Sequence, residues 1–150
     1  SDSMRLVCHK AYHDIPFAHR APLHDGHCKF VHGHNWSFKF TFEAKQLDEN
    51  GFVMDFGKLA PLRAWLGRLD HSLVIPKDDP DRRVFETLHL KGLVQLVLVD
   101  HGSSCEAIAK WAFEEADRIV REATEDRAFC IRCIVNEDAK NSATCTSFGE

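Results

Sequence analysis

The segment from Asn35 to Glu43 constrains the fold most strongly, because aromatic and polar side chains alternate along it. Such alternation is typical of a β-strand with one buried face, since successive side chains of a strand point to opposite sides. The aromatic side chains share one parity: Trp36, Phe38, Phe40 and Phe42. His32 and His34 have the same parity, so we expect their imidazoles to continue the buried face of this strand.

These two histidines indicate a metal site. The His32-Gly33-His34 tripeptide places two imidazoles on one side of a strand, close enough to bind one ion. His19 follows a short apolar run and can face the same interior. Three histidines with one open position form a catalytic type of zinc site, whereas a structural site has four protein ligands. The alternative is a chance pairing, because the chain contains 10 histidines.

Cys28 lies four residues before His32 and can reach the same pocket. A thiol beside a metal ion and a histidine loses its proton more readily than an isolated thiol, which makes Cys28 a candidate acid/base or nucleophile. The alternative is that Cys28 is only a small buried hydrophobic residue.

Four further acidic or histidine residues carry both a functional and a structural interpretation. Asp70 and His71 follow a predicted helix, where the carboxylate can orient the imidazole or the histidine can simply satisfy the last helical carbonyls. Glu106 stands three residues after Ser103, the pattern of a capping box, which explains it without any ligand. Glu137 comes at the end of a predicted strand, where acidic residues are often only solvated.

The coarse pattern predicts one α+β domain over residues 1–150. Strands are expected over residues 4–13, 35–43, 52–54, 93–99 and 128–135, with helices following Asp55 and Ser103. Residues 76–83 are predicted to be a charged surface loop, and the C-terminal tail is predicted to be irregular. This order favours an antiparallel sheet with two helices on one face.

Composition excludes several classes of protein. The net charge is −4 and there is no basic tail, which argues against nucleic-acid binding, and no apolar run is long enough to span a bilayer. No signal peptide is expected from the first residues of this sequence. The 6 cysteines are spread over predicted strands, a loop and a helix start, so we expect reduced thiols and a cytoplasmic location.

Six motifs in a fixed order resemble one known family. They are F-A-H-R at Phe17–Arg20, C-x-x-x-H-G-H-N at Cys28–Asn35, L-D-E-N-G-F-V-M-D-F at Leu47–Phe56, L-D-H at Leu69–His71, S-S-C-E at Ser103–Glu106 and the acidic strand end at Glu137. Together they resemble the 6-pyruvoyl-tetrahydropterin synthase family. The three-residue gap between Cys28 and His32 is most similar to the bacterial 6-carboxy-tetrahydropterin synthases of queuosine biosynthesis.

The resemblance implies a zinc-dependent lyase with the tunnelling fold, whose subunits join edge to edge into a barrel as a trimer or a dimer of trimers. It implies zinc bound by His19, His32 and His34, with Cys28, Asp70 and His71 as catalytic residues. It also implies that Glu137 and Glu106 bind the pterin. The reaction implied converts 7,8-dihydroneopterin triphosphate to 6-carboxy-5,6,7,8-tetrahydropterin, acetaldehyde and triphosphate.

Two other functions stay open on the sequence. One is a synthase of another branch, which makes 6-pyruvoyl-tetrahydropterin or a folate precursor from the same substrate. The other is a non-catalytic zinc- or pterin-binding module, in which Cys28 closes the site as a fourth ligand. The chain also departs from the family by a longer segment between His71 and Ser103, by Cys105 and by the residues after Glu137.

Overall fold

The computed structural model describes residues 4–147 and contains one six-stranded sheet in the order β4-β3-β1-β2-β5-β6. The strands are β1 (Val7–His19), β2 (His32–Ala44), β3 (Ser72–Pro76), β4 (Gln95–Val99), β5 (Ala128–Asn136) and β6 (Ser142–Thr146). The helices are α1 (Ala60–Leu69), α2 (Arg82–Leu90) and α3 (Cys105–Thr124), with short 3₁₀ helices at His27–Lys29 and Phe56–Lys58. No helix in this part of the chain combines the length and apolar character needed to cross a membrane.

The α+β class is confirmed, but the sheet is mixed rather than wholly antiparallel. β1, β2, β5 and β6 pair antiparallel, while β3 runs parallel to both β1 and β4. Parallel neighbours need a crossover connection, and α2 lies in the connection between β3 and β4. The sequence patterns did not predict β3 and α2, because a short apolar run and a charged segment do not by themselves reveal a crossover unit.

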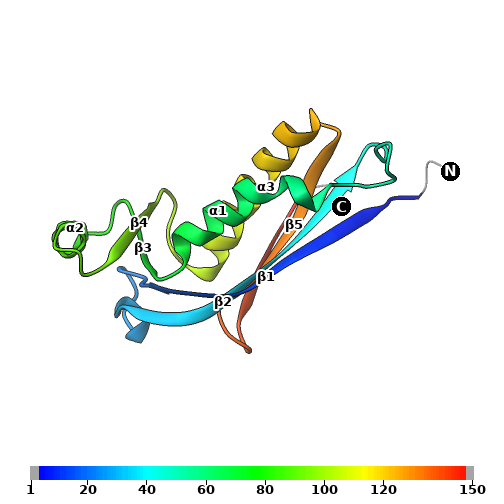
Figure 1. Cartoon of the computed structure of the whole chain (residues 1–150). Helices are drawn as coiled ribbons and strands as arrows, with labels where there is room; N and C mark the ends of the chain where they lie inside the picture. Colours follow the sequence, from blue (N-terminus) through cyan, green and yellow to red (C-terminus); the bar gives the residue numbers. More distant parts are fainter. Residues whose placement is uncertain (1–3, 148–150) are drawn as a thin grey trace.

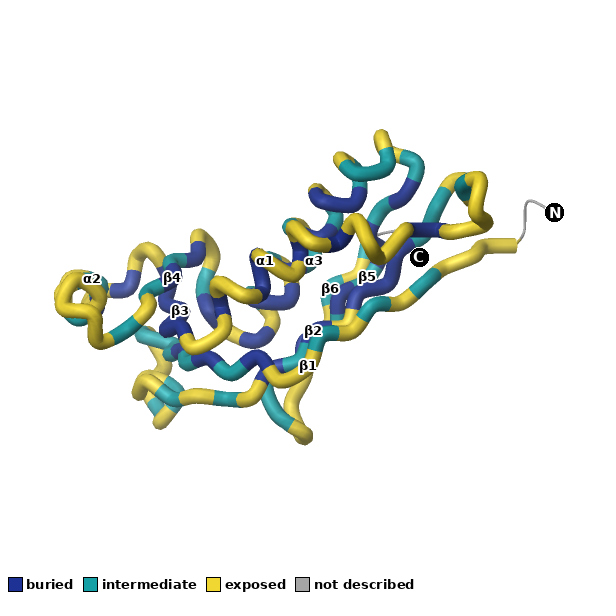
Figure 2. The backbone as a smooth tube through the Cα atoms, in the orientation of Figure 1, coloured by how far each residue is buried: buried dark blue, intermediate teal, exposed yellow. Residues whose placement is uncertain are grey.

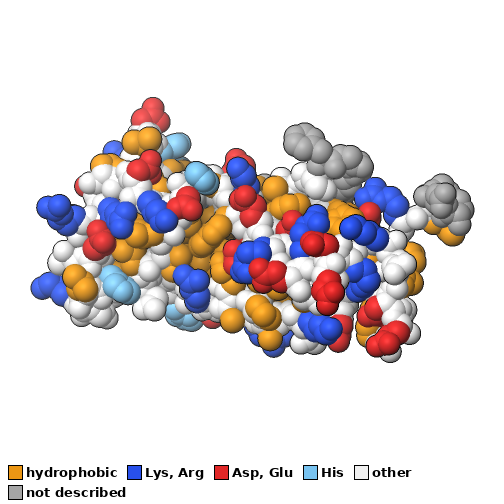
Figure 3. All heavy atoms as spheres, turned by 90° about the horizontal axis from the view of Figure 1, so that it is seen from above, with side chains coloured by type: hydrophobic (Ala, Val, Ile, Leu, Met, Phe, Trp, Pro, Cys, Tyr) orange, Lys and Arg blue, Asp and Glu red, His pale blue; other side chains and the backbone are white. Residues whose placement is uncertain are grey.

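The helices form two groups. α1 and α3 lie together over one face of the long antiparallel strands, as predicted, whereas α2 lies apart beside β3 and β4 (Figure 1). α2 packs on its own small cluster of Leu73, Ile75 and Phe85. Viewed from the helix side, acidic and basic side chains are interleaved, without a large field of one sign on that face (Figure 3).

Several local predictions were wrong. Residues 52–54 form no strand, although Val53 and Met54 are buried in the core, and the tail contains β6 rather than irregular chain. Asp55 caps the 3₁₀ helix before α1, accepting a 2.9 Å hydrogen bond from the Gly57 amide. Ser104, not Ser103, caps α3 by accepting from the Ala107 amide, so the capping-box register does not exist.

The buried side of the antiparallel strands is built on the aromatic residues of β2. Trp36, Phe38, Phe40 and Phe42 are each at most 1% exposed. Figure 2 shows this buried lining on the strands beneath α1 and α3. Phe17 stacks on Trp36 with ring centroids 4.3 Å apart, and the Trp36 indole donates to the Phe17 carbonyl oxygen. The alternation read from the sequence is therefore confirmed along β2.

A β-bulge in β1 changes which of its residues face this core. Tyr12 lies opposite Phe38 and Ile15 lies opposite Trp36, so β1 contains one residue more than β2 in this interval. Asp14 has a left-handed φ of 60°, and its carboxylate accepts a 3.0 Å hydrogen bond from the Asn35 side chain. Because an extra residue reverses the parity of a strand, the odd-numbered residues after the bulge face inward.

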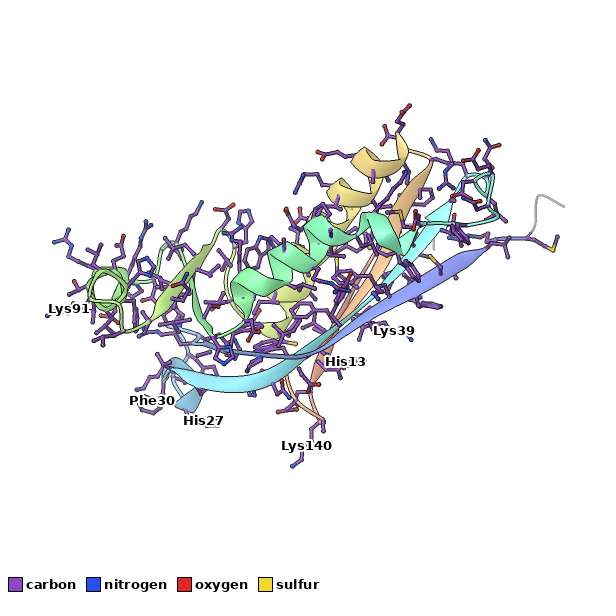
Figure 4. The ribbon with its side chains drawn as sticks, viewed as in Figure 1. His13, His27, Phe30, Lys39, Lys91 and Lys140 are labelled. Carbon is purple, nitrogen blue, oxygen red and sulfur yellow. The ribbon has the colours of Figure 1, made fainter. Side chains whose placement is uncertain are left out.

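A second bulge has the same effect in β5. Thr41 lies opposite Arg132 while Phe42 lies opposite Cys130, which leaves Ile131 as the extra residue. After it the buried residues are Cys133 and Val135, and Glu137 continues their parity just beyond the strand. The two bulges therefore bring His19 and Glu137 to the face that carries His32 and His34. His13, Lys39 and Lys140 lie on the opposite, helix-free side (Figure 4).

Candidate metal centre

Three histidines converge where the end of β1 meets the start of β2. His19 lies directly opposite His32 in the antiparallel register, and His34 lies opposite Phe17. One ring nitrogen from each of the three histidines lies within 4.8 Å of the others. The ring centroids are 4.6 Å apart for His19 and His32 and 5.1 Å apart for His32 and His34. The expected meeting of His19 with the His32–His34 pair is confirmed.

Backbone carbonyls orient two of these rings. His19 Nδ1 is 2.6 Å from the Ser103 carbonyl oxygen, and His32 Nδ1 is 2.7 Å from the Phe30 carbonyl oxygen. A carbonyl only accepts, so each Nδ1 carries the hydrogen and a neutral ring has its lone pair on Nε2. Metal-binding histidines are commonly held in this way. Ser103, which the sequence analysis treated as a helix cap, thus positions His19 through its backbone.

The electrostatics of the centre favour a neutral ligand set. Burial lowers the pKa of His19 to about 4, against the hydrogen bond to Ser103 and with smaller contributions from His32 and His34. A neutral imidazole is the form that binds a metal ion. The Nε2 atoms of His19 and His34 are buried without a hydrogen-bond partner among the described residues. Unpartnered nitrogen atoms that converge on one point fit a bound cation.

Glu137 lies against the same cluster. Its Oε2 atom is 3.0 Å from His34 Nε2 and 3.6 Å from His19 Nε2. Asp138 is farther away, with its Oδ2 4.0 Å from His34 Nδ1. On the sequence alone, solvation is enough to explain an acidic residue at this strand end. In the structure, the Glu137 carboxylate instead lies beside the histidines.

A family profile described as 6-pyruvoyl tetrahydropterin synthase matches residues 9–147, nearly the whole chain. The chain belongs to this family. Curated relatives named 6-carboxy-5,6,7,8-tetrahydropterin synthase include one from Rickettsia typhi, 34% identical over 70 residues, and one from Rickettsia bellii, 37% identical over 65 residues. These matches cover 45% and 42% of this chain and 51% and 47% of those proteins. The chain thus spans about half the length of the curated relatives that it matches.

Solved structures share the fold. An uncharacterized protein from Wolinella succinogenes superposes with a TM-score of 0.81 at 19% identity, covering 97% of this chain and 99% of that one. A Plasmodium vivax 6-pyruvoyltetrahydropterin synthase mutant superposes with a TM-score of 0.66 at 18% identity, covering 95% of this chain and 98% of that one. At these identities the structures support the fold alone.

Cys28 lies in the short 3₁₀ helix between β1 and β2 and is half-buried. Its carbonyl oxygen accepts a 2.8 Å hydrogen bond from the Ala21 amide, which closes the loop. Within residues 4–147 no hydrogen bond joins the thiol to the histidines of this synthase-family centre, and the thiol is not part of the ligand cluster. This arrangement does not supply the fourth, closing cysteine ligand of a structural zinc site.

Asp70 and His71 form a tight hydrogen-bonded pair. Asp70 Oδ1 is 2.6 Å from His71 Nδ1, and the His71 side chain is 83% exposed. His71 adopts a left-handed φ of 62° directly after α1, and its amide donates to the Pro16 carbonyl oxygen at 2.7 Å. Within the described residues no hydrogen bond or ion pair joins this pair to Cys28 or to the three histidines, although His71 and His34 line one hollow of about 510 Å³.

Glu106 is exposed at the second position of α3 and makes no hydrogen bond or ion pair within the described chain. The preceding residue, Cys105, is buried. Burial, with smaller contributions from the charges of Glu137 and Glu106, raises the pKa of Cys105 to about 12. The thiol is 3.5 Å from the Val135 carbonyl oxygen and donates to it, so the start of α3 lies beside the end of β5 that leads to Glu137.

A hollow of about 740 Å³ lies beside this helix start, lined in part by Ala21, His24, Asp78, His101, Ser103 and Ser104. Ser103 joins it to the metal centre, because its carbonyl oxygen binds His19. Arg20, the residue after His19, is engaged by two acids: its guanidinium is 3.2 Å from both Asp79 and Asp81. Its role is thus to bind these two acids, which the sequence alone did not reveal.

Proposed function

We propose that this protein is a zinc-dependent 6-carboxy-5,6,7,8-tetrahydropterin synthase that acts on 7,8-dihydroneopterin triphosphate in queuosine biosynthesis. The observation that carries the proposal is the convergence of three ring nitrogens within 4.8 Å on a family-matched chain. The names of the matched relatives favour the carboxy branch over the pyruvoyl branch. The described residues contain no disulfide, which fits the reducing cytoplasm that we propose as the location of the protein.

Zinc suits this donor set. Imidazole nitrogens are common zinc ligands, and three of them leave a fourth position for substrate. When bound there, the ion supplies Lewis-acid chemistry at the hydroxyl oxygens of the substrate side chain. His19 and His32 are held ready for this by their carbonyl partners, so little reorganisation is needed on binding.

Cys28 and the Asp70–His71 pair are the proposed acid/base groups. His71 is the second residue after α1 and adopts the left-handed conformation, which glycine adopts with less strain. A strained backbone at a histidine whose exposed ring is held by Asp70 favours a functional role over simple helix capping. Cys28 would take a proton from the substrate, and His71, oriented by Asp70, would exchange a proton on the other side.

Glu137 and Glu106 are the proposed pterin ligands. An ionised carboxylate can accept two parallel N–H hydrogen bonds from a guanidine-like edge. The contact of the Cys105 thiol with the Val135 carbonyl oxygen supports a shared location for the two carboxylates, because Glu106 follows Cys105 and Glu137 lies two residues after Val135.

We propose a homo-oligomer, a trimer or a dimer of trimers. β1 pairs with β3 only at Ala18 and His19, so within the described chain the rest of that side of β1 has no neighbouring strand. At the opposite end of the sheet, β6 is the last strand and its outer side is also open. Open edges favour pairing with another copy of the chain. Such an assembly can also bring the exposed Asp70–His71 pair of one copy to a site of another.

The test is to incubate the zinc-loaded protein with 7,8-dihydroneopterin triphosphate and to identify the products. Acetaldehyde together with 6-carboxytetrahydropterin is expected, whereas 6-pyruvoyl-tetrahydropterin without acetaldehyde would indicate the other branch. No turnover in any condition would favour a binding module.

Cys28→Ala is expected to lower turnover by about a hundred- to ten-thousandfold, because it removes one acid/base group. Zinc and pterin binding should be retained. Cys145→Ala, which changes a half-buried cysteine in β6, serves as the control and should keep full activity. Near-normal turnover of Cys28→Ala would contradict its assigned role.

A further inference from the structure

We infer that Glu137 is the fourth ligand of the metal ion in the substrate-free protein, closing the position that the substrate must take. This inference rests on the proposed metal site of His19, His32 and His34. It assigns to Glu137 a second role, which precedes its proposed contact with the pterin.

Two distances from the Glu137 carboxylate, to His34 and to His19, fit a ligand shell, whereas the group whose ligand atoms all lie within 4.8 Å of one another comprises the three histidines alone. In a tetrahedral site with bonds of about 2.0–2.2 Å, neighbouring ligand atoms lie roughly 3.3–3.5 Å apart. Glu137 Oε2 lies 3.0 Å from His34 Nε2 and 3.6 Å from His19 Nε2. The two separations bracket the expected edge of such a tetrahedron.

Hydrogen bonding does not explain this approach. Neither Nε2 atom has a hydrogen-bond partner, although the carboxylate oxygen is close to both. In His19 the hydrogen is on Nδ1, which donates to Ser103, so the Nε2 lone pair of the neutral ring faces the carboxylate. Two acceptors that face each other repel, and a cation between them reverses the sign of the interaction.

The local structure holds Glu137 in place. Its amide donates to the Asn141 carbonyl oxygen at 3.1 Å, which continues the ladder between β5 and β6. Asp138 Oδ1 then accepts from the amides of Lys140 and Asn141, both at 2.8 Å, and fixes the turn. The Glu137 side chain is only 20% exposed. The carboxylate is therefore presented by an ordered strand end and not by a loosely held loop.

The substrate-free site would then be closed by protein atoms. A hydroxyl oxygen of the substrate must replace the Glu137 carboxylate oxygen, an exchange of ligands without any change of oxidation state. The released carboxylate is then free to accept N–H groups of the pterin. Metal binding and substrate binding are thereby linked through one side chain.

The experiment measures zinc affinity by competition with a chromophoric chelator, using the whole protein prepared without metal. Glu137→Ala and the milder Glu137→Gln are compared with wild type, with Asp138→Asn as the matched control for the neighbouring acid. We expect Glu137→Ala to bind zinc about 10- to 100-fold more weakly, the range seen when groups supporting a metal are removed. Asp138→Asn should stay within about threefold of wild type. Far-UV circular dichroism and urea midpoints verify that each variant folds.

Two negative outcomes are distinguishable. If His32→Ala loses zinc while both Glu137 variants bind it like wild type, Glu137 is not a ligand and the metal site stands. If His32→Ala also binds zinc like wild type, the proposed metal site itself is wrong. Cobalt(II) gives a second readout, because its visible spectrum should differ between wild type and Glu137→Ala but not between wild type and Asp138→Asn.

Discussion

The two ends of β2 present the same face of one strand but have opposite characters. At the aromatic end, Phe38 and Phe40 are at most 1% exposed and lie in the main hydrophobic core. At the imidazole end, His32 and His34 are only partly buried, and buried nitrogen atoms lack partners. Alternation therefore determines which side chains share a face, while the surrounding elements decide whether that face becomes core or site.

The two ends also differ in how their neighbours reach the face. Before its bulge, β1 presents even-numbered residues such as Tyr12 to the aromatic end. After the bulge it presents Phe17 and His19. One inserted residue at Asp14 thus separates a part of β1 that supports packing from a part that supplies a ligand.

The aromatic end should dominate stability regardless of metal. Phe40→Ala is expected to lower the free energy of unfolding by about 3–5 kcal/mol, because it removes a fully buried ring and leaves a cavity. Urea denaturation with and without zinc should show the same loss in both conditions. Phe30→Ala, at a ring that is 62% exposed, is the control and should change stability by less than about 0.5 kcal/mol. A loss that disappears when zinc is added would mean that the two ends are not independent.

The bulge should couple the two ends. Asp14→Val places a β-branched residue at a φ of 60° and is expected to lower stability by about 1–2 kcal/mol. Zinc affinity should fall as well, because a displaced bulge moves His19. Asp14→Gly tolerates this φ and also lacks the contact with Asn35, so the difference between the two variants isolates the backbone effect. Urea midpoints and zinc competition measure both quantities. Equal behaviour of the two variants would contradict the importance of the left-handed residue.

The smallest effect concerns a buried thiol at the aromatic end. Cys133 lies opposite Phe40, and burial raises the pKa of its thiol above the ordinary value near 9. The thiol ionises at a lower pH in the unfolded chain than in the folded protein. The neutral buried thiol therefore contributes its full share to the free energy of unfolding below pH 9, and this contribution is lost as the pH rises above 9. Each pH unit above this value should cost up to about 1.4 kcal/mol.

The urea midpoints of wild type and Cys133→Ala at pH 8 and pH 10 measure this loss of stability with pH. The pH-dependent loss should be smaller by about 1 kcal/mol in the variant, whatever its stability at pH 8. Identical pH dependence in the two proteins would show that this thiol does not remain neutral in the fold. The comparison uses the change with pH, so the cavity left by the substitution cancels.

The local patterns of the chain were sufficient for β2, for the positions of α1 and α3, and for the His32–His34 pair on a buried face. Each depends on a period that is read within one element, two residues for a strand and 3.6 for a helix. The ordered motifs were also sufficient for the family, which the profile over residues 9–147 confirms.

Only the tertiary structure decided how residues of different strands share a site. Parity cannot be counted across a bulge, so the approach of Glu137 to His34 depends on the pairing of β5 with β2. The parallel unit of β3, α2 and β4 likewise depends on contacts between segments distant in sequence. The physical reason is that backbone alternation is a local property, whereas register is set by the partner strand and by the core that both strands bury.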